Sequence, residues 1–448
     1  MFRPFQASSP IPLLYRLFCL SLFFVLYQCA EQPSQSTVPT TAFQQMADSS
    51  QFHVSVQQIT FGPKHHWFGY YDKLEFSPTN RYVLSNQVNF EHRSPRADDV
   101  IQVGMIDLKN GNEWIPFGES RAWNWQQGCM LQWLPGSENE VIWNDRQDGQ
   151  FVAHILNVET GEQRTIPSPV YAVSPDGKMA VTLDFERLND TRPGYGYAGN
   201  FDENAEVLAP ENAGIYRVDL ETGERELIIS IAQMANRLPE SDDPSDTHGG
   251  TSKHWFNHLL FSPDGERFIF LHRWRSPSKR KQGGFATLMY TANIDGSDIR
   301  LVDSSGYTSH FIWRDAEHIL AWTKQSSHGN GFYLFKDGDT TATKVVGQEK
   351  MPVNGHNTYL PNTNNEWVLN DTYPQGEKRQ QQVYLYHIPT DTRLPLGDFY
   401  LPSEYKGEWR VDTHPRASRD GRQVVIDCPL GDAGRQLLLL EVPAKVFQ

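Results

Sequence analysis

A strand–turn–strand unit recurs along the chain and constrains the fold more than any other feature of the sequence. Each unit has an apolar strand, a tight turn such as SPDG at 262–265, and a second apolar strand, followed by a third strand and usually a shorter fourth. Four short strands repeated about every 40 to 60 residues are typical of a β-propeller. The units begin at Lys73, Met130, Val170, His258, His310, His356 and His414. The sequence therefore predicts an all-β fold, a seven-bladed β-propeller with four-stranded antiparallel blades.

The seventh unit lacks an outer strand, because the chain stops after RQLLLLEVPAKVFQ. The stretch FHVSVQQITF, at 52–61, alternates like a strand and precedes the first unit. We expect this N-terminal strand to pair with the seventh blade and close the ring, since closure leaves few open strand edges.

The first residues differ in character from the rest and divide the chain into 1–29, 30–50 and 51–448. Arg3 and Arg16 precede LFCLSLFFVLY, which is short for a membrane span but suits the core of a signal peptide. Residues 1–29 are thus a predicted signal peptide, 30–50 a polar tether and 51–448 the propeller. Two alternatives stay open: Cys29 is lipidated, as in bacterial lipoproteins, or it is not. We expect an exported protein, periplasmic, anchored to the outer membrane or secreted.

The third unit departs from a simple repeat. It carries insertions at 184–213 and 235–253, and long insertions in one blade usually line a functional face.

The only cysteines after the tether are Cys129 and Cys428, both in predicted strands, so two buried free thiols and one disulfide are equal alternatives.

Four consecutive units begin with a histidine, although the chain has only 15 histidines in 448 residues. Inner strands of a propeller run along the central channel, so equivalent positions in successive blades meet near the axis. His258, His310, His356 and His414 should therefore lie side by side. The alternative is that strand starts beside a wet channel simply tolerate polar residues.

A group of neutral imidazoles from separate strands suits Mn²⁺, Zn²⁺ or Fe²⁺, and three ligands would leave positions open for substrate oxygens. The fourth histidine would then be available as an acid or base near neutral pH. Spacing alone leaves open which histidine that is. Without metal, protonated imidazoles would bind an anion electrostatically. Arg410, four residues before His414, and Asn257, next to His258, can reach the same face.

The net charge of −14 argues against binding to nucleic acid, since no general excess of Lys and Arg is present to neutralise phosphates. A local cationic cluster on an acidic exported protein suits a substrate with carboxylates or sulfates. The economical chemistry is β-elimination on a uronic acid: a neutralised carboxylate acidifies the C5 proton, which a histidine or tyrosine removes. The expected partner is an anionic oligo- or polysaccharide, the membrane is contacted only through a lipid anchor, and the chain is expected to be a monomer.

With these repeats and histidines, the sequence from 52 to 448 resembles the β-propeller polysaccharide lyases, namely the oligogalacturonate lyases and, more loosely, the ulvan lyases. Similarity to the first group implies a divalent metal, Mn, Zn or Ca, held by His310, His356 and His414, with His258 as the base. Similarity to the second implies no metal, with histidines and a tyrosine as base and acid and an arginine that neutralises the carboxylate. Tyr197 and Arg217 would be that pair.

The remaining predicted site residues lie beside the channel histidines, at the start of the first unit or in the first insertion. Arg410 is a predicted catalytic residue, and the predicted substrate-binding residues are Lys73, Arg192, Tyr195 and Asn257. A competing hypothesis is a non-catalytic periplasmic propeller, a binding or scaffold lipoprotein. It predicts that alanine at 258 and 310 leaves function intact.

Overall fold

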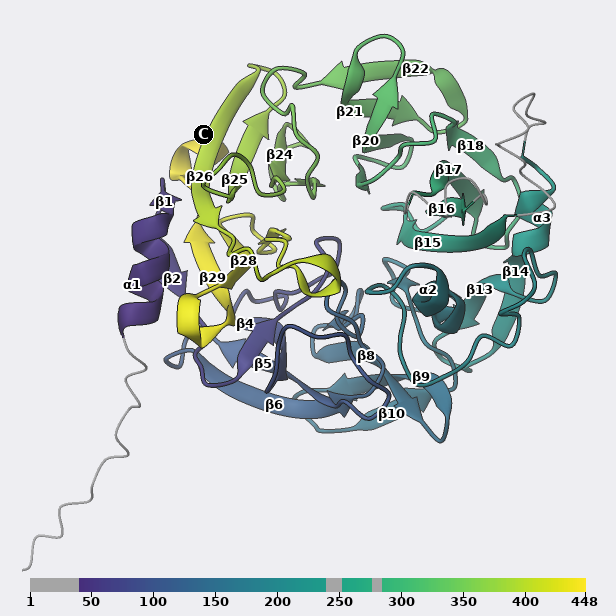
Figure 1. Ribbon diagram of the computed structural model, residues 1–448, viewed down its shortest axis with the longest axis horizontal. Coiled ribbons are helices and arrows are strands. Elements are labelled where there is room, and N and C mark those ends of the chain that lie inside the picture. Colours follow the sequence, from purple (N-terminus) through teal and green to yellow (C-terminus); the bar gives the residue numbers. More distant parts are fainter. Residues whose placement is uncertain (1–39, 239–251, 276–283) are drawn as a thin grey trace, which may run out of the picture. The chain divides into compact units, whose positions relative to one another are not determined.

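The computed structural model describes residues 40–238, 252–275 and 284–448, and in these ranges the chain forms seven antiparallel sheets arranged as the blades of a β-propeller (Figure 1). Blade 1 comprises β3 (His65–Trp67), β4 (Tyr82–Val88), β5 (Ile101–Asp107) and β6 (Glu113–Ser120). Blade 2 comprises β7 (Gln132–Trp133), β8 (Glu140–Gln147), β9 (Gln150–Asn157) and β10 (Gln163–Ile166). Blade 3 comprises β11 (Ala172–Val173), β12 (Met179–Leu183), β13 (Gly214–Asp219) and β14 (Arg225–Ser230).

The remaining blades follow in chain order. Blade 4 comprises β15 (Lys253–Phe261), β16 (Arg267–Arg275), β17 (Ala286–Asn293) and β18 (Arg300–Asp303). Blade 5 comprises β19 (Phe311–Trp313), β20 (His318–Gln325), β21 (Gly329–Lys336) and β22 (Asp339–Val346). Blade 6 comprises β23 (Thr358–Tyr359), β24 (Trp367–Asn370), β25 (Gln380–His387) and β26 (Thr392–Tyr400), and blade 7 comprises β27 (Arg416–Ala417), β28 (Gln423–Pro429) and β29 (Arg435–Glu441).

The N-terminal stretch closes the ring as the sequence predicts. Strand β2 (Val56–Gln58) pairs antiparallel with β29 and becomes the outer strand of blade 7, with Val56 opposite Leu440. Strand β1 (Gln51–Phe52) adds a fifth strand to blade 6 by pairing with β26. The N-terminal segment therefore ties blades 6 and 7 together.

The turns between the first and second strands of several blades explain the SPDG signature. In blade 4 the Ser262 hydroxyl donates to Asp264 (2.6 Å) and accepts the backbone N–H of Arg267 (3.1 Å). Gly265 has a φ of +77°, which glycine adopts without steric cost. The same side-chain bridge recurs between Ser174 and Asp176 in blade 3.

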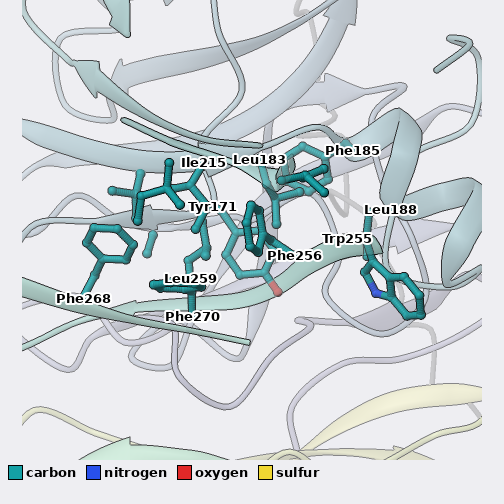
Figure 2. Close-up of a cluster of buried hydrophobic side chains, with 14 of the residues drawn as sticks. Tyr171, Leu183, Phe185, Leu188, Ile215, Trp255, Phe256, Leu259, Phe268 and Phe270 are labelled. Atoms are coloured by element: carbon teal, nitrogen blue, oxygen red, sulfur yellow. The ribbon is translucent and has the colours of Figure 1, made fainter. Parts of the chain in front are cut away.

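The apolar core of the described residues is divided into clusters, and seven of them join neighbouring blades, the largest reaching from Phe151 of blade 2 to blades 3 and 4. The cluster between blades 3 and 4 is enlarged by helix α2 (Phe185–Thr191) of the first insertion. Figure 2 shows Phe185 and Leu188 of this helix beside Phe256 and Trp255 of β15. The insertion is thus anchored in the core, and the chain that follows α2 can be held in a fixed place.

Two of the predicted segments, the tether and the second insertion, differ from the structure or lie largely outside the described residues. Residues 40–49 form helix α1 (Thr40–Ser49) instead of a tether, because Phe43 and Met46 pack on the core of blades 6 and 7. The predicted signal peptide and the start of the tether lie outside the described residues, as does most of the 235–253 insertion, whose first residue is the last of helix α3 (Ile231–Ala235). The described residues contain no helix that is long and apolar enough to cross a membrane. Cys129 and Cys428 are buried free thiols, so of the two alternatives the disulfide is wrong.

Candidate functional site

The four predicted histidines lie together at the inner ends of blades 4 to 7. The ring centroids of His310 and His356 are 4.2 Å apart, and those of His356 and His414 are also 4.2 Å apart. The Tyr70 ring joins His258 to this group, stacked on His258 at 5.1 Å and edge-on to His414 at 5.2 Å. All four imidazoles are buried.

The backbone is strained in three of the seven blades at the position that begins the repeat unit, where the histidines stand. His258 and His414 have φ values of +53° and +40°, and Met130, at the equivalent position of blade 2, has +56°. At His258 a bulge interrupts the pairing of β15 with β16, and the Asn257 side chain accepts the His258 backbone N–H at 2.9 Å. Positive φ at residues other than glycine costs energy and clusters at functional sites. The predicted substrate-binding Asn257 thus orients His258.

Two of the histidines and one aspartate form a candidate metal centre. His356, His414 and Asp412 each offer a ligand atom within 4.8 Å of the others, and all three are buried. The Nε2 atoms of both histidines and the Oδ1 atom of Asp412 are buried without a hydrogen-bond partner. Buried polar atoms without partners are costly, and a ligand that binds them removes the cost. Two imidazole nitrogens and a carboxylate oxygen suit Mn²⁺ or Zn²⁺, so the residues present fit a divalent cation.

The orientation of His356 is set by a buried carboxylate. Its Nδ1 lies 2.9 Å from Asp371 Oδ1, and its backbone N–H donates to the same oxygen at 2.7 Å. Burial alone would raise the pKa of Asp371, but His356 and Thr413 hold it below its usual value. A carboxylate behind the histidine leaves Nε2 free to face a metal, which is the usual arrangement around metal-ligating imidazoles.

His310 stands beside this centre without belonging to the group of three. Its Nδ1 is 2.9 Å from Asn354 Oδ1, and its Nε2 is 3.5 Å from the Tyr373 hydroxyl. Burial, followed by the proximity of His356, lowers the pKa of His310 well below its usual value. The structure therefore joins two of the three predicted metal ligands with Asp412, and places the third next to them.

A second cluster faces His258 from two other parts of the chain. Tyr195 comes from the first insertion and Arg410 from the segment between blades 6 and 7, and Arg410 donates a 2.9 Å hydrogen bond to the Tyr195 hydroxyl. The Tyr195 ring lies edge-on to His258 at 5.5 Å. Arg410 also donates to Asp412 at 2.7 Å, so it links Tyr195 to the candidate metal centre.

The electrostatics of these groups are unusual. Burial would raise the pKa of Tyr195, but the positive charges of Arg410 and Arg192 outweigh burial and lower it. Burial, with nearby cations led by Arg273, holds the pKa of His258 well below its usual value. At neutral pH His258 is therefore neutral, and Tyr195 is a stronger acid than an ordinary tyrosine.

An aromatic loop of blade 1, which the strand repeat does not predict, lies among the histidines. The inner strand was expected to begin at Lys73, but β3 ends at Trp67 and the pairing resumes only at Phe76. The intervening residues leave the sheet and bring Tyr70 and Tyr71 among the histidines. Lys73 belongs to this loop as well, and it pairs with its neighbour Asp72 at 3.0 Å.

Two predicted catalytic residues lie outside the cluster. Tyr197 is buried in the core between blades 3 and 4, stacked on Phe185 at 4.1 Å, and its hydroxyl accepts from Asn144. Arg217 lies on β13, where it pairs with Glu226 at the surface (2.6 Å). Their assignment is therefore corrected. Along RPGYGYAG it is Tyr195, not Tyr197, that faces the channel.

The other predicted site residue, Arg192, lies at the rim. Its guanidinium is 5.0 Å from the centroid of the Tyr195 ring, and the residue is half-buried, like Tyr373, Asn354 and Arg410. Asn354 and Tyr373 contact His310, whereas Arg410 and Arg192 contact Tyr195. A cavity of about 840 Å³ lies elsewhere, beside the first insertion, and Asp184 and Tyr216 are among its lining residues.

No protein-family model matches the sequence, and no curated protein matches it. The fold is similar to that of an oligogalacturonate lyase solved in complex with manganese, with a TM-score of 0.62 at 17% identity over 89% of this chain and 95% of that chain. It is also similar to an oligogalacturonate lyase from Vibrio parahaemolyticus, with a TM-score of 0.60 at 14% identity over 88% and 95% of the two chains. These likenesses confirm, at the level of the fold, the resemblance noted in the sequence.

Proposed function

We propose that this chain is a polysaccharide lyase that cleaves a uronic-acid-containing glycan, of the oligogalacturonate or ulvan type, by β-elimination. The observation that carries the proposal is the set of buried, unpartnered atoms on His356, His414 and Asp412, next to His258, Tyr195 and Arg410. The likeness in fold to two oligogalacturonate lyases supports the same class of reaction.

His356, His414 and Asp412 would hold the cation, and one structurally similar lyase was solved with manganese. When bound, a divalent cation supplies charge neutralisation for a uronate carboxylate, which makes the neighbouring C5 proton more acidic. Asp371 keeps the His356 ring in the orientation that leaves Nε2 available.

His258 is the proposed base and Tyr195 the proposed acid. The neutral His258 imidazole takes the C5 proton, the C4–O bond breaks as the C4–C5 double bond forms, and the Tyr195 hydroxyl gives its proton to the leaving oxygen. The low pKa of Tyr195 favours this donation, and Arg410 stabilises the phenolate that remains.

The test is an absorbance assay with matched variants. The protein is incubated with oligogalacturonate and with ulvan oligosaccharides, and the ultraviolet absorbance of the unsaturated product is followed. We expect a signal from the wild type on one of these substrates and its loss in His258→Ala. An equal signal in the variant would exclude His258 as the base, and no signal on any uronate glycan would favour a non-catalytic binding propeller.

A further inference from the structure

Two arginines share one aromatic ring beside the site. The guanidinium carbon of Arg273, on β16, is 4.8 Å from the centroid of the Phe285 ring, and that of Arg192 is 5.3 Å from it. Arg273 is only 5% exposed, and its Nε donates to the Thr287 hydroxyl at 3.2 Å. The Nε of Arg192 is buried and has no partner.

In the described ranges neither arginine has a carboxylate within ion-pair distance, although other buried arginines do. Arg187 pairs with Asp202 at 3.0 Å, and Arg416 pairs with both Glu75 and Asp427. Burial, followed by the charge of Arg192, lowers the pKa of Arg273 to about 10. A buried guanidinium beside a half-buried one, with no carboxylate to compensate them, destabilises a fold, and such an arrangement is typical of a site where a ligand supplies the opposite charge.

A chain of side-chain contacts runs from the arginine pair through the proposed acid to the candidate metal centre. Arg192 lies over the Tyr195 ring, Tyr195 accepts from Arg410, and Arg410 donates to Asp412. The half-buried side chains of Arg192 and Arg410 lie at the rim, so a ligand can approach from solvent. A chain of sugars crossing Tyr195 would place one residue near the metal ligands and its neighbour near the arginines.

We propose that Arg192 and Arg273 form a second anion receptor, which binds the charged group of the sugar adjoining the uronate that loses its C5 proton. This inference rests on the proposed function for its substrate, though not for the anion site itself. Guanidinium groups bind carboxylates and sulfates through paired N–H donors, so the anion is a sulfate ester or a second carboxylate. The proposal accounts for two charges that the protein leaves uncompensated.

The first test uses inorganic sulfate and thermal unfolding, and needs no activity. Sulfate should raise the Tm of the wild type more than chloride at equal ionic strength, and this difference should be smaller in Arg273→Met and Arg192→Met, where only the general stabilising effect of sulfate remains. Without sulfate, Arg273→Met should raise the Tm, because it removes a buried charge that has no counterion. The matched control Arg187→Met should lower the Tm, because it leaves Asp202 unpaired.

Two results would overturn the anion receptor. One is a fall in Tm for Arg273→Met as large as that for Arg187→Met, which would make Arg273 a structural residue. The other is a sulfate response in both Arg192→Met and Arg273→Met that is as large as in the wild type.

The second test identifies the source of the anion by kinetics. With ulvan oligosaccharides, desulfated ulvan oligosaccharides and oligogalacturonate as substrates, we expect Arg273→Met to lower kcat/KM by about 10- to 100-fold wherever the neighbouring sugar carries the anion. A loss confined to sulfated ulvan assigns the site to sulfate, and a loss on oligogalacturonate assigns it to carboxylate. On each of the three substrates, a kcat/KM of Arg273→Met equal to that of the wild type would refute the receptor. If the wild type cleaves none of them but responds to sulfate more strongly than both variants, the lyase proposal fails and the anion site stands.

Discussion

Replacing Asp371 by asparagine tests the carboxylate that orients the candidate metal centre. Asp371 Oδ1 accepts the backbone N–H of His356 at 2.7 Å and lies 2.9 Å from its Nδ1, while Oδ2 accepts the Thr413 hydroxyl at 2.6 Å. Asparagine has nearly the same shape, and its Oδ1 can keep both contacts to His356. Its amide can donate to Thr413 in place of the lost acceptor. The change therefore removes the negative charge and leaves most of the packing.

The size of the effect follows from the hydrogen bonds that lose their charge. A hydrogen bond to a charged group contributes about 1.5–3 kcal/mol, against about 0.5–1.5 kcal/mol for a neutral pair. The Nδ1 contact should thus weaken by about 1–1.5 kcal/mol, which corresponds to about a tenfold loss of affinity for a ligand bound through His356. Loss of a carboxylate behind a metal-ligating histidine typically weakens metal binding by about 10- to 100-fold.

The assay is calorimetric titration of Mn²⁺ into metal-free protein, wild type and Asp371→Asn, with thermal unfolding measured alongside. We predict a Kd about 10- to 100-fold weaker in the variant and a cooperative unfolding transition that is retained. Equal Mn²⁺ affinities in two well-folded proteins would refute the claim that Asp371 prepares His356 as a ligand.

Three further outcomes follow from the structure. Tyr195→Phe should lower kcat by about 100- to 10,000-fold as a lost proton donor, whereas Tyr197→Phe should change it by less than about threefold, as measured by product absorbance. Tyr195 must be protonated to donate, so the rate should fall as pH rises through its pKa; in Arg410→Met that pKa rises, and the alkaline limb of the pH–rate profile should move to higher pH. Deleting residues 1–61 removes β2 and the fully buried Ile59, which alone contributes about 1.5–3 kcal/mol, so the Tm should fall sharply, and an unchanged Tm would contradict closure of blade 7 by β2.

The fold was predictable because its determinants are local and repeated. Each SPDG turn carries its own hydrogen bonds, and the alternating strands around it repeat in every blade, so counting units gave the blade number. Closure by the N-terminal strand followed from the missing outer strand of the last unit. Helix α1 was missed because two apolar residues, Phe43 and Met46, are a weak signal in a polar segment.

The site was predictable only where it follows the repeat. The four histidines share one column, so their convergence followed from the alignment. Asp412 lies two residues before His414, and a search for acidic residues near each histidine would have found it. Tyr70 and Tyr71 belong to a loop that interrupts the inner strand, and the periodicity of apolar residues does not predict where a strand is interrupted. The choice between Tyr195 and Tyr197 depends on how one loop folds against α2, which is tertiary packing.

The central claim is that the channel cleaves glycans by elimination, and product analysis in oxygen-18 water tests it most directly. Mass spectrometry of uronate oligosaccharides after incubation with the Mn²⁺-loaded protein should show a fragment that lacks one water relative to a hydrolysis product and carries no oxygen-18 at its new non-reducing end. Fragments that all have the full mass of hydrolysis products, with no unsaturated fragment among them, would show hydrolysis instead, and oligosaccharides left intact would contradict a lyase altogether.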